Sequence, residues 1–200
     1  MARSRSTARL RLTLALIVLL IVLVAVSHRD SFGALAGSLL GLTGLACVTV
    51  AALGRIWTSL FVAGYKDERL VREGPYSACR HPLYAFSMLA MLGLGLATRS
   101  IILAAALLVL FSSLYLWAMR SEDHYLATRH GAAFETFRRE VGALWPDRSA
   151  YRVPVRYEIR PRVFWKAFVD AGSLFGAYLL IRLADLLQQY GITPTLMGLP

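Results

Sequence analysis

Four charged residues beside long uncharged segments are the first candidates for chemistry. Arg80 and His81 precede Pro82, which suits the first turn of a helix because its missing N–H would lack a partner there. Helix amino ends attract anions, so a ligand carboxylate or phosphate could bind there. Glu122 and Asp123 follow shortly after an uncharged run and could face a cation. The alternative is that these side chains reach lipid headgroups or cap a solvated helix end.

The elements that would position these residues are membrane helices. The chain has 200 residues, of which 57% are hydrophobic and 17% charged, and a soluble domain of this size could not bury so much apolar surface. A membrane span needs about 20 apolar residues. Four uncharged runs are close to this length, and they cover residues 12–26, 31–54, 82–98 and 100–119. The sequence therefore predicts an all-α integral membrane bundle with four to five spans.

Two of the apolar runs have a second interpretation. Residues 12–26 follow an arginine-rich start and precede Ser27, which also fits a secretory signal peptide with a small-residue cleavage site. Residues 163–187 form a weaker fifth run that contains Asp170, Arg182 and Asp185. This run is either a span or an interfacial helix. Both alternatives leave the other spans unchanged.

The basic residues predict the orientation of the bundle. Of the 22 Lys and Arg residues, 19 fall on one side if the N-terminus is inside, which the positive-inside rule favours. We therefore expect a cytosolic N-terminus and site, in the inner membrane of a bacterium. The basic excess follows from topology and attraction to anionic lipids, so no nucleic-acid partner is expected. Two cysteines make neither a disulfide framework nor a metal-ligand set, and no metal site is predicted.

The runs also divide the chain. Residues 1–54 would form two N-terminal helices, residues 55–150 a core with a helical hairpin at 82–119, and residues 151–200 a basic linker with the fifth helix. Gly131 permits a helix break, after which Phe134 and Phe137 share one face. Glycines at three- to four-residue spacing in the second run favour close helix packing.

One motif order is more specific than composition. ERLVREGPYSACRHPLY is followed by a hydrophobic hairpin, by ED-x2-L-x4-G-x2-F-x2-F and by a proline. This order, over roughly residues 55–146, resembles the isoprenylcysteine carboxyl methyltransferase family and the wider membrane methyltransferases that include phospholipid methyltransferases. The resemblance implies S-adenosylmethionine as cofactor, in a cytosolic pocket built from a loop, a helix N-terminus and a C-terminal helical segment. The cofactor-binding residues would be Glu68, Arg69, Leu70, Val71, Tyr76, Arg80, His81, Pro82, Leu83, Tyr84 and Glu122.

The chain departs from this family at the position that concerns the substrate. Members that methylate a prenylated cysteine carry an arginine four residues before the first acid, and this chain has Ala118 there. The second acid is Asp123 instead of the usual glutamate, and two expected tyrosines are phenylalanines. Arg120, the nearest arginine, and Asp123, which could accept a proton, are the candidate catalytic residues.

The expected function is methyl transfer to a carboxylate, or another nucleophile, of a lipid-soluble or prenylated small substrate. Membrane lipids are the expected surroundings, and the sequence leaves the oligomeric state open. A carboxylate is already ionised near neutral pH, so this reaction would need no general base. Phospholipid or other small-lipid N- or O-methylation is the nearest alternative. An NADPH-dependent membrane reductase and a non-catalytic membrane assembly factor are the alternatives from other classes.

Overall fold

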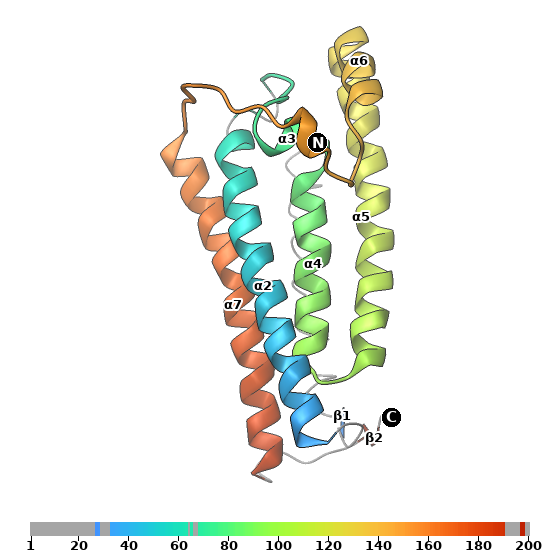
Figure 1. The fold of residues 1–200 in the computed structure, drawn as a ribbon, viewed down its shortest axis with the longest axis vertical. Coiled ribbons are helices and arrows are strands. Elements are labelled where there is room, and N and C mark those ends of the chain that lie inside the picture. Colours follow the sequence, from blue (N-terminus) through green and yellow to red (C-terminus); the bar gives the residue numbers. More distant parts are fainter. Residues whose placement is uncertain (1–26, 29–32, 64, 66–67, 191–196, 199–200) are drawn as a thin grey trace.

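The computed structural model describes residues 27–28, 33–63, 65, 68–190 and 197–198. In this part of the chain, four long helices run side by side (Figure 1): α2 (Ala34–Val62), α4 (Pro82–Ala97), α5 (Ile101–His130) and α7 (Pro161–Gln189). At one end lie α3 (Pro75–Ala78), α6 (Ala132–Glu140) and the 3-10 turn η1 (Arg148–Ala150). At the other end, β1 (Ser27–His28) pairs in parallel with β2 (Met197–Gly198). The expected all-α membrane bundle is confirmed, while the first predicted helix, 12–26, lies outside the described residues.

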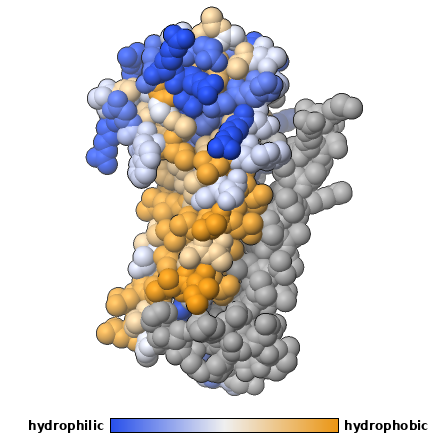
Figure 2. All heavy atoms as spheres, turned by 90° about the vertical axis from the view of Figure 1, so that its right-hand side faces the viewer, coloured by the Kyte–Doolittle hydropathy of each residue, from blue (hydrophilic) through white to orange (hydrophobic). Residues whose placement is uncertain are grey.

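Three of the described helices are long and apolar enough to cross a membrane. The candidate spans are Leu35–Val62, Ile101–His130 and Pro161–Leu187, so the weak fifth run does form a helix of spanning length. Helix α4 has 16 residues, about 24 Å at 1.5 Å per residue, which is shorter than a hydrocarbon core of about 30 Å. Figure 2 shows a band of hydrophobic side chains below a hydrophilic end, as a membrane protein requires.

The predicted helical hairpin is present. Helix α4 ends at Ala97 and α5 begins at Ile101, with Thr98, Arg99 and Ser100 in the turn. Arg99 has φ of 59°, and the Ser100 hydroxyl accepts a hydrogen bond from the Leu103 N–H at 3.3 Å. The turn is therefore tight enough to set α4 and α5 antiparallel.

Small residues bring α2 and α4 into close contact. A Cβ placed on Gly44 would lie 2.7 Å from the Gly93 carbonyl oxygen, and one on Gly93 would lie 2.8 Å from the Gly44 carbonyl oxygen. Both distances are below van der Waals contact, so only glycine fits at this crossing. Helix α7 packs beside α2, where the Tyr178 hydroxyl donates a hydrogen bond to the Gly41 carbonyl at 2.9 Å. These contacts fix three helices around the core.

Helix α2 is longer than the uncharged run that predicted it. The run ends at Gly54, but the helix continues to Val62 because apolar residues resume after Arg55. Arg55 therefore lies inside the helix, seven residues before its end, and not in the connection to the next span. As a result, Arg55 can contact the neighbouring helices α4 and α7.

Candidate functional site

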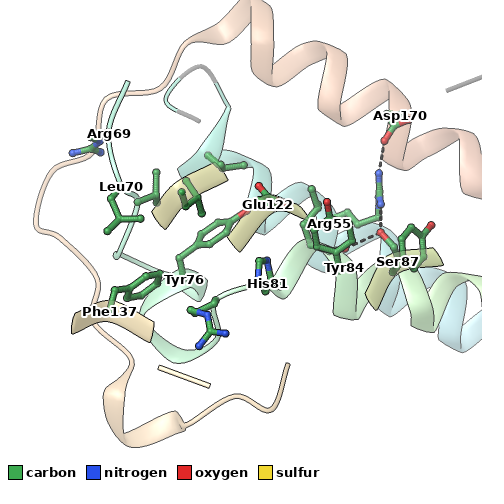
Figure 3. Close-up of a pocket in the computed structure, with 16 residues that line it drawn as sticks. Arg55, Arg69, Leu70, Tyr76, His81, Tyr84, Ser87, Glu122, Phe137 and Asp170 are labelled. Atoms are coloured by element: carbon green, nitrogen blue, oxygen red, sulfur yellow. Dashed lines mark hydrogen bonds and ion pairs between the residues drawn. The ribbon is translucent and has the colours of Figure 1, made fainter. Parts of the chain in front are cut away.

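A cavity of about 310 Å³ lies at the charged end of the bundle, between α2, α3, α4, α5, α6 and α7 (Figure 3). Its volume is at the lower end of the range for small-molecule sites, about 300–1,000 Å³. The lining residues are Arg55, Val62, Arg69, Leu70, Val71, Tyr76, Arg80, His81, Leu83, Tyr84, Ser87, Tyr115, Glu122, Leu126, Phe137 and Asp170.

The turn before α3 holds Tyr76 in the cavity wall. Gly74 has φ of 59°, and its N–H donates to the Arg152 carbonyl at 2.7 Å. The Ser77 hydroxyl donates to the Gly74 carbonyl at 2.7 Å and accepts from the Arg152 N–H at 2.8 Å. A side chain at position 74 would meet the Phe61 ring, so a glycine is required there. The segment around residue 152 therefore holds the turn before Tyr76 in place through these hydrogen bonds.

Tyr76 is kept as a neutral phenol. Its burial raises its pKa far above the ordinary value, and the nearby Glu122 carboxylate raises it further. A neutral phenol beside a carboxylate presents a hydrogen-bonding hydroxyl and an aromatic face to a ligand.

An ionic network connects α4 with α5 behind the cavity. Asp123 Oδ1 lies 2.8 Å from His81 Nε2, and Asp123 Oδ2 lies 3.2 Å from an Arg80 nitrogen. The other terminal nitrogen of Arg80 donates to the carbonyls of Arg138 at 3.0 Å and Val141 at 2.7 Å. Both carboxylate oxygens of Asp123 are therefore engaged with side chains that line the cavity, while Asp123 itself does not line it.

The amide groups just before α4 are also engaged. The Arg80 and His81 N–H groups donate to the carbonyls of Gly142 and Ala143 at 2.9 and 3.0 Å. The expectation that an anion could bind at this helix end stays a prediction for the side chains and the helix itself. The two backbone donors before the helix are bound by the segment after α6, which fixes the backbone at Arg80 and His81.

Aromatic side chains continue the wall toward the membrane. The His81 and Tyr84 rings meet edge to face with centroids 5.7 Å apart, and Tyr84 lies 5.6 Å from Tyr115 on α5. Phe137 on α6 lines the cavity and is buried in a cluster with Phe134. Gly131, with φ of 53°, ends α5 and allows α6 to turn back, as predicted.

Arg69 is an exposed cation at the edge of the cavity. Its guanidinium carbon lies 4.7 Å from the Tyr65 ring centroid and 5.2 Å from that of Tyr157. A hydrogen bond with Tyr157 raises the pKa of Arg69 further, so it stays charged. Glu68 turns away from the cavity and pairs with Arg160 through two contacts of 2.6 Å.

Not every predicted residue reaches the cavity. Pro82 is buried at the start of α4, Arg120 is exposed on α5, and Ala118 is half-buried on α5; none of the three lines the cavity. The lining does contain nine predicted cofactor residues, which are Arg69, Leu70, Val71, Tyr76, Arg80, His81, Leu83, Tyr84 and Glu122.

The sequence analysis missed the polar residues at the membrane side of the cavity. Arg55 on α2 donates hydrogen bonds to Ser87 on α4 and to Asp170 on α7. Tyr115 on α5 completes this region. A signal is present, because charged residues inside apolar helices usually mark functional sites. In the sequence analysis, the basic residues, Arg55 among them, serve only to set the orientation.

Comparisons with known proteins agree with the motif order. A family model described as phospholipid methyltransferase matches residues 32–133. The nickel-cobalt-cadmium resistance protein NccN of Alcaligenes xylosoxydans xylosoxydans is 36% identical over 157 residues, covering 78% of this chain and 73% of that protein. The cobalt-zinc-cadmium resistance protein CzcN of Cupriavidus metallidurans is 33% identical over 160 residues, covering 80% and 74%. No solved structure gives a significant match. Within the described residues, no group of three or more His, Cys, Asp or Glu side chains could hold a metal ion.

Proposed function

The chain belongs to the phospholipid methyltransferase family, and from this premise we propose that it transfers a methyl group from S-adenosylmethionine to a lipid-soluble acceptor. The observation that carries the proposal is the cavity in which Tyr76, His81, Tyr84 and Glu122 meet at the charged end of an apolar bundle. A water-soluble cofactor could enter such a cavity from the aqueous side and an apolar acceptor from the membrane.

The residues around the cavity suit the chemistry of this cofactor, which supplies an activated methyl group on a sulfonium cation. Glu122 would face its positive groups. Arg69 would face its carboxylate, together with Arg80, whose buried Nε has no hydrogen-bond partner among the described residues. Tyr76 and Tyr84 would cover the adenine ring.

The protein's task would be alignment and exclusion of water. A carboxylate acceptor is already deprotonated near neutral pH, so its oxygen can take the methyl group without a general base. The network of Arg80, His81 and Asp123 would hold the cavity wall in place. The segment around Arg152, which is hydrogen-bonded to the turn before α3, would limit the entry of water. An amine acceptor, as in phospholipid methylation, would instead require a residue to take up a proton, for which His81 is the nearest candidate.

Calorimetry with S-adenosylhomocysteine on the detergent-purified protein tests the proposal. Glu122→Gln removes a charge but keeps the shape, and we expect its affinity to fall about 100-fold because a charge-assisted contact is lost. Glu135→Gln, an exposed change on α6 outside the cavity, is the matched control. Undiminished binding by Glu122→Gln, or binding of NADPH in place of S-adenosylhomocysteine, would contradict the assignment. Binding of neither ligand would favour the non-catalytic assembly factor.

We place the cavity on the cytosolic side of a bacterial inner membrane. The support is the charge distribution, since 18 of the 22 basic residues fall on one side in this orientation when Arg55, which lies inside α2, is left out of the count. Cysteines introduced at Ser149 and at Ser100 would lie at opposite ends of the bundle, and a membrane-impermeant thiol reagent applied to intact cells should label only the second. Labelling of the first alone would reverse the orientation.

The names of the relatives suggest a biological setting. We propose that methyl transfer by this chain contributes to resistance to divalent metal ions, as those proteins' names state for them. Growth of a deletion strain in cobalt or nickel, complemented with wild type or Glu122→Gln, tests this directly. Rescue by wild type alone would support a role through the cavity, and equal rescue by both would exclude it.

A further inference from the structure

Arg55 is a half-buried charge inside a candidate membrane span, beside the cavity. It lies seven residues before the end of α2, about 10 Å along the helix axis at 1.5 Å per residue. The residues before it, 31–54, are uncharged, and apolar residues follow it. Its side chain is only 19% exposed. Ionisable residues in such positions are costly and are usually retained because they face a partner or a ligand.

The partners of Arg55 do not use all of its capacity. Its two terminal nitrogens bind Ser87 and Asp170, as Figure 3 shows. Its Nε is buried and has no hydrogen-bond partner among the described residues. A guanidinium has five N–H donors and prefers bidentate contact with a carboxylate or phosphate. One buried donor thus remains unused on a residue that lines the cavity.

Among the described residues, the carboxylate paired with Arg55 is only a partial partner. Asp170 is 52% exposed and contacts one terminal nitrogen of Arg55, so this pair need not break when a second anion binds the rest of the guanidinium. The Ser87 hydroxyl donates to the Leu83 carbonyl at 2.7 Å and is neutral. A second anion could therefore bind Arg55 without leaving a buried charge uncompensated.

We propose that Arg55 binds the anionic group of a membrane-soluble acceptor. This inference rests on the proposed function and specifies its substrate class: an amphiphile with a carboxylate or phosphate on an apolar chain. The location of Arg55 within an apolar helix requires a ligand whose charged group enters to that depth. Tyr115, which also lines the cavity, adds a hydroxyl at the same end.

Binding of labelled palmitate to the protein in lipid nanodiscs tests the inference without any turnover. Unlabelled palmitate and hexadecyl phosphate are the anionic competitors, and hexadecanol is the neutral one. We expect both anions to compete and hexadecanol to fail. Arg55→Gln should weaken palmitate binding about 30-fold, as loss of a charge-assisted hydrogen bond does. Arg55→Lys keeps the positive charge but not the bidentate guanidinium. Its affinity for palmitate should lie between those of wild type and Arg55→Gln.

Two controls distinguish binding at Arg55 from general attraction of anions and from damage to the cofactor site. Arg162→Gln removes an exposed charge at the same end of the bundle, at the start of α7, and reports on non-specific attraction of anions. Its palmitate binding should equal that of wild type. S-adenosylhomocysteine binding by Arg55→Gln should stay within about threefold of wild type, since Arg55 is not a proposed cofactor residue. Failure of wild type to bind S-adenosylhomocysteine would defeat the proposed function but leave palmitate binding by Arg55 as a separate result.

The labelled methylation product then distinguishes a carboxylate from a phosphate as the anionic group of the acceptor. Labelled methyl that mild base releases as methanol would identify a carboxylate acceptor, and base-stable label on a phospholipid would identify a phosphate beside a different nucleophile. The inference is overturned if Arg55→Gln binds palmitate as wild type does, or if hexadecanol competes as well as palmitate.

Discussion

The two ends of the bundle each hold half-buried arginines that pair with an aspartate of α7, but the aspartates differ in exposure. At the site end, Arg55 pairs with Asp170 of α7 and borders a cavity. At the hairpin end, Asp185 of α7 lies 2.8 Å from a terminal nitrogen of Arg182 and 3.2 Å from Arg99 Nε. Asp185 is only 5% exposed, whereas Asp170 is half-exposed.

Glycines contribute to the packing at the hairpin end. Gly37 faces the Arg99 side chain and Gly41 faces that of Arg182, so both arginines pack against α2. At the site end, Arg55 and Asp170 line a cavity instead. Under the proposal made above, the hairpin-end cluster would serve stability and the site-end pair ligand binding. Variants at each end test this division.

The largest effect is expected at the hairpin end. Asp185→Asn removes the buried carboxylate that two half-buried arginines share, and breaking a buried ion pair costs about 3–5 kcal/mol. We expect the free energy of unfolding in mixed micelles to fall by that amount. Material that remains folded should bind S-adenosylhomocysteine as wild type does. Unchanged stability, or lost binding in folded protein, would contradict the division.

Asp123→Asn is expected to lower the affinity for S-adenosylhomocysteine by about 10-fold or more, since hydrogen bonds to charged groups are worth about 1.5–3 kcal/mol. Asp123 touches His81 and Arg80 and not the cavity, so it would act by positioning them. Calorimetry should therefore show weaker S-adenosylhomocysteine binding. A variant with normal binding but a lost rate and an altered pH profile would instead make Asp123 a proton acceptor, the role that the sequence suggested.

The sequence predicted features that local residues determine. The turn at Thr98–Ser100 and the break at Gly131 follow from short-range chemistry, and both are present. The partners of Arg55 could not be predicted, because Asp170 is 115 residues away and the helices meet only through packing. Backbone carbonyls that bind the Arg80 and His81 amides also leave no trace in residue types. Asp170 and Asp185 weakened the prediction of a fifth span, yet both have arginine partners within the bundle.

A smaller effect is expected for Asp170→Asn, the counterpart of the hairpin-end variant on the same helix. Because Asp170 is half-exposed and pairs with one arginine instead of two, its loss should lower the free energy of unfolding by less than the loss of Asp185 does. Its removal also frees Arg55 from a competing anion, so palmitate should bind the variant more tightly than wild type. A loss of stability equal to that of Asp185→Asn would show that the two ends do not differ as described.

The smallest effect is expected at the exposed pair of Glu68 and Arg160, which ties the loop before α3 to the segment before α7. The hydrogen bond from Arg160 holds the pKa of Glu68 below its ordinary value of 4.5. A depressed carboxyl pKa stabilises the folded state above the ordinary pKa, and this contribution is lost as pH falls through the folded pKa. Glu68→Gln should therefore lower the unfolding temperature slightly at pH 7 and not at all once the carboxyl is protonated. A difference that persisted in acid would assign the effect to packing of the side chain, and a large one at pH 7 would make this exposed pair as important as the buried cluster around Asp185.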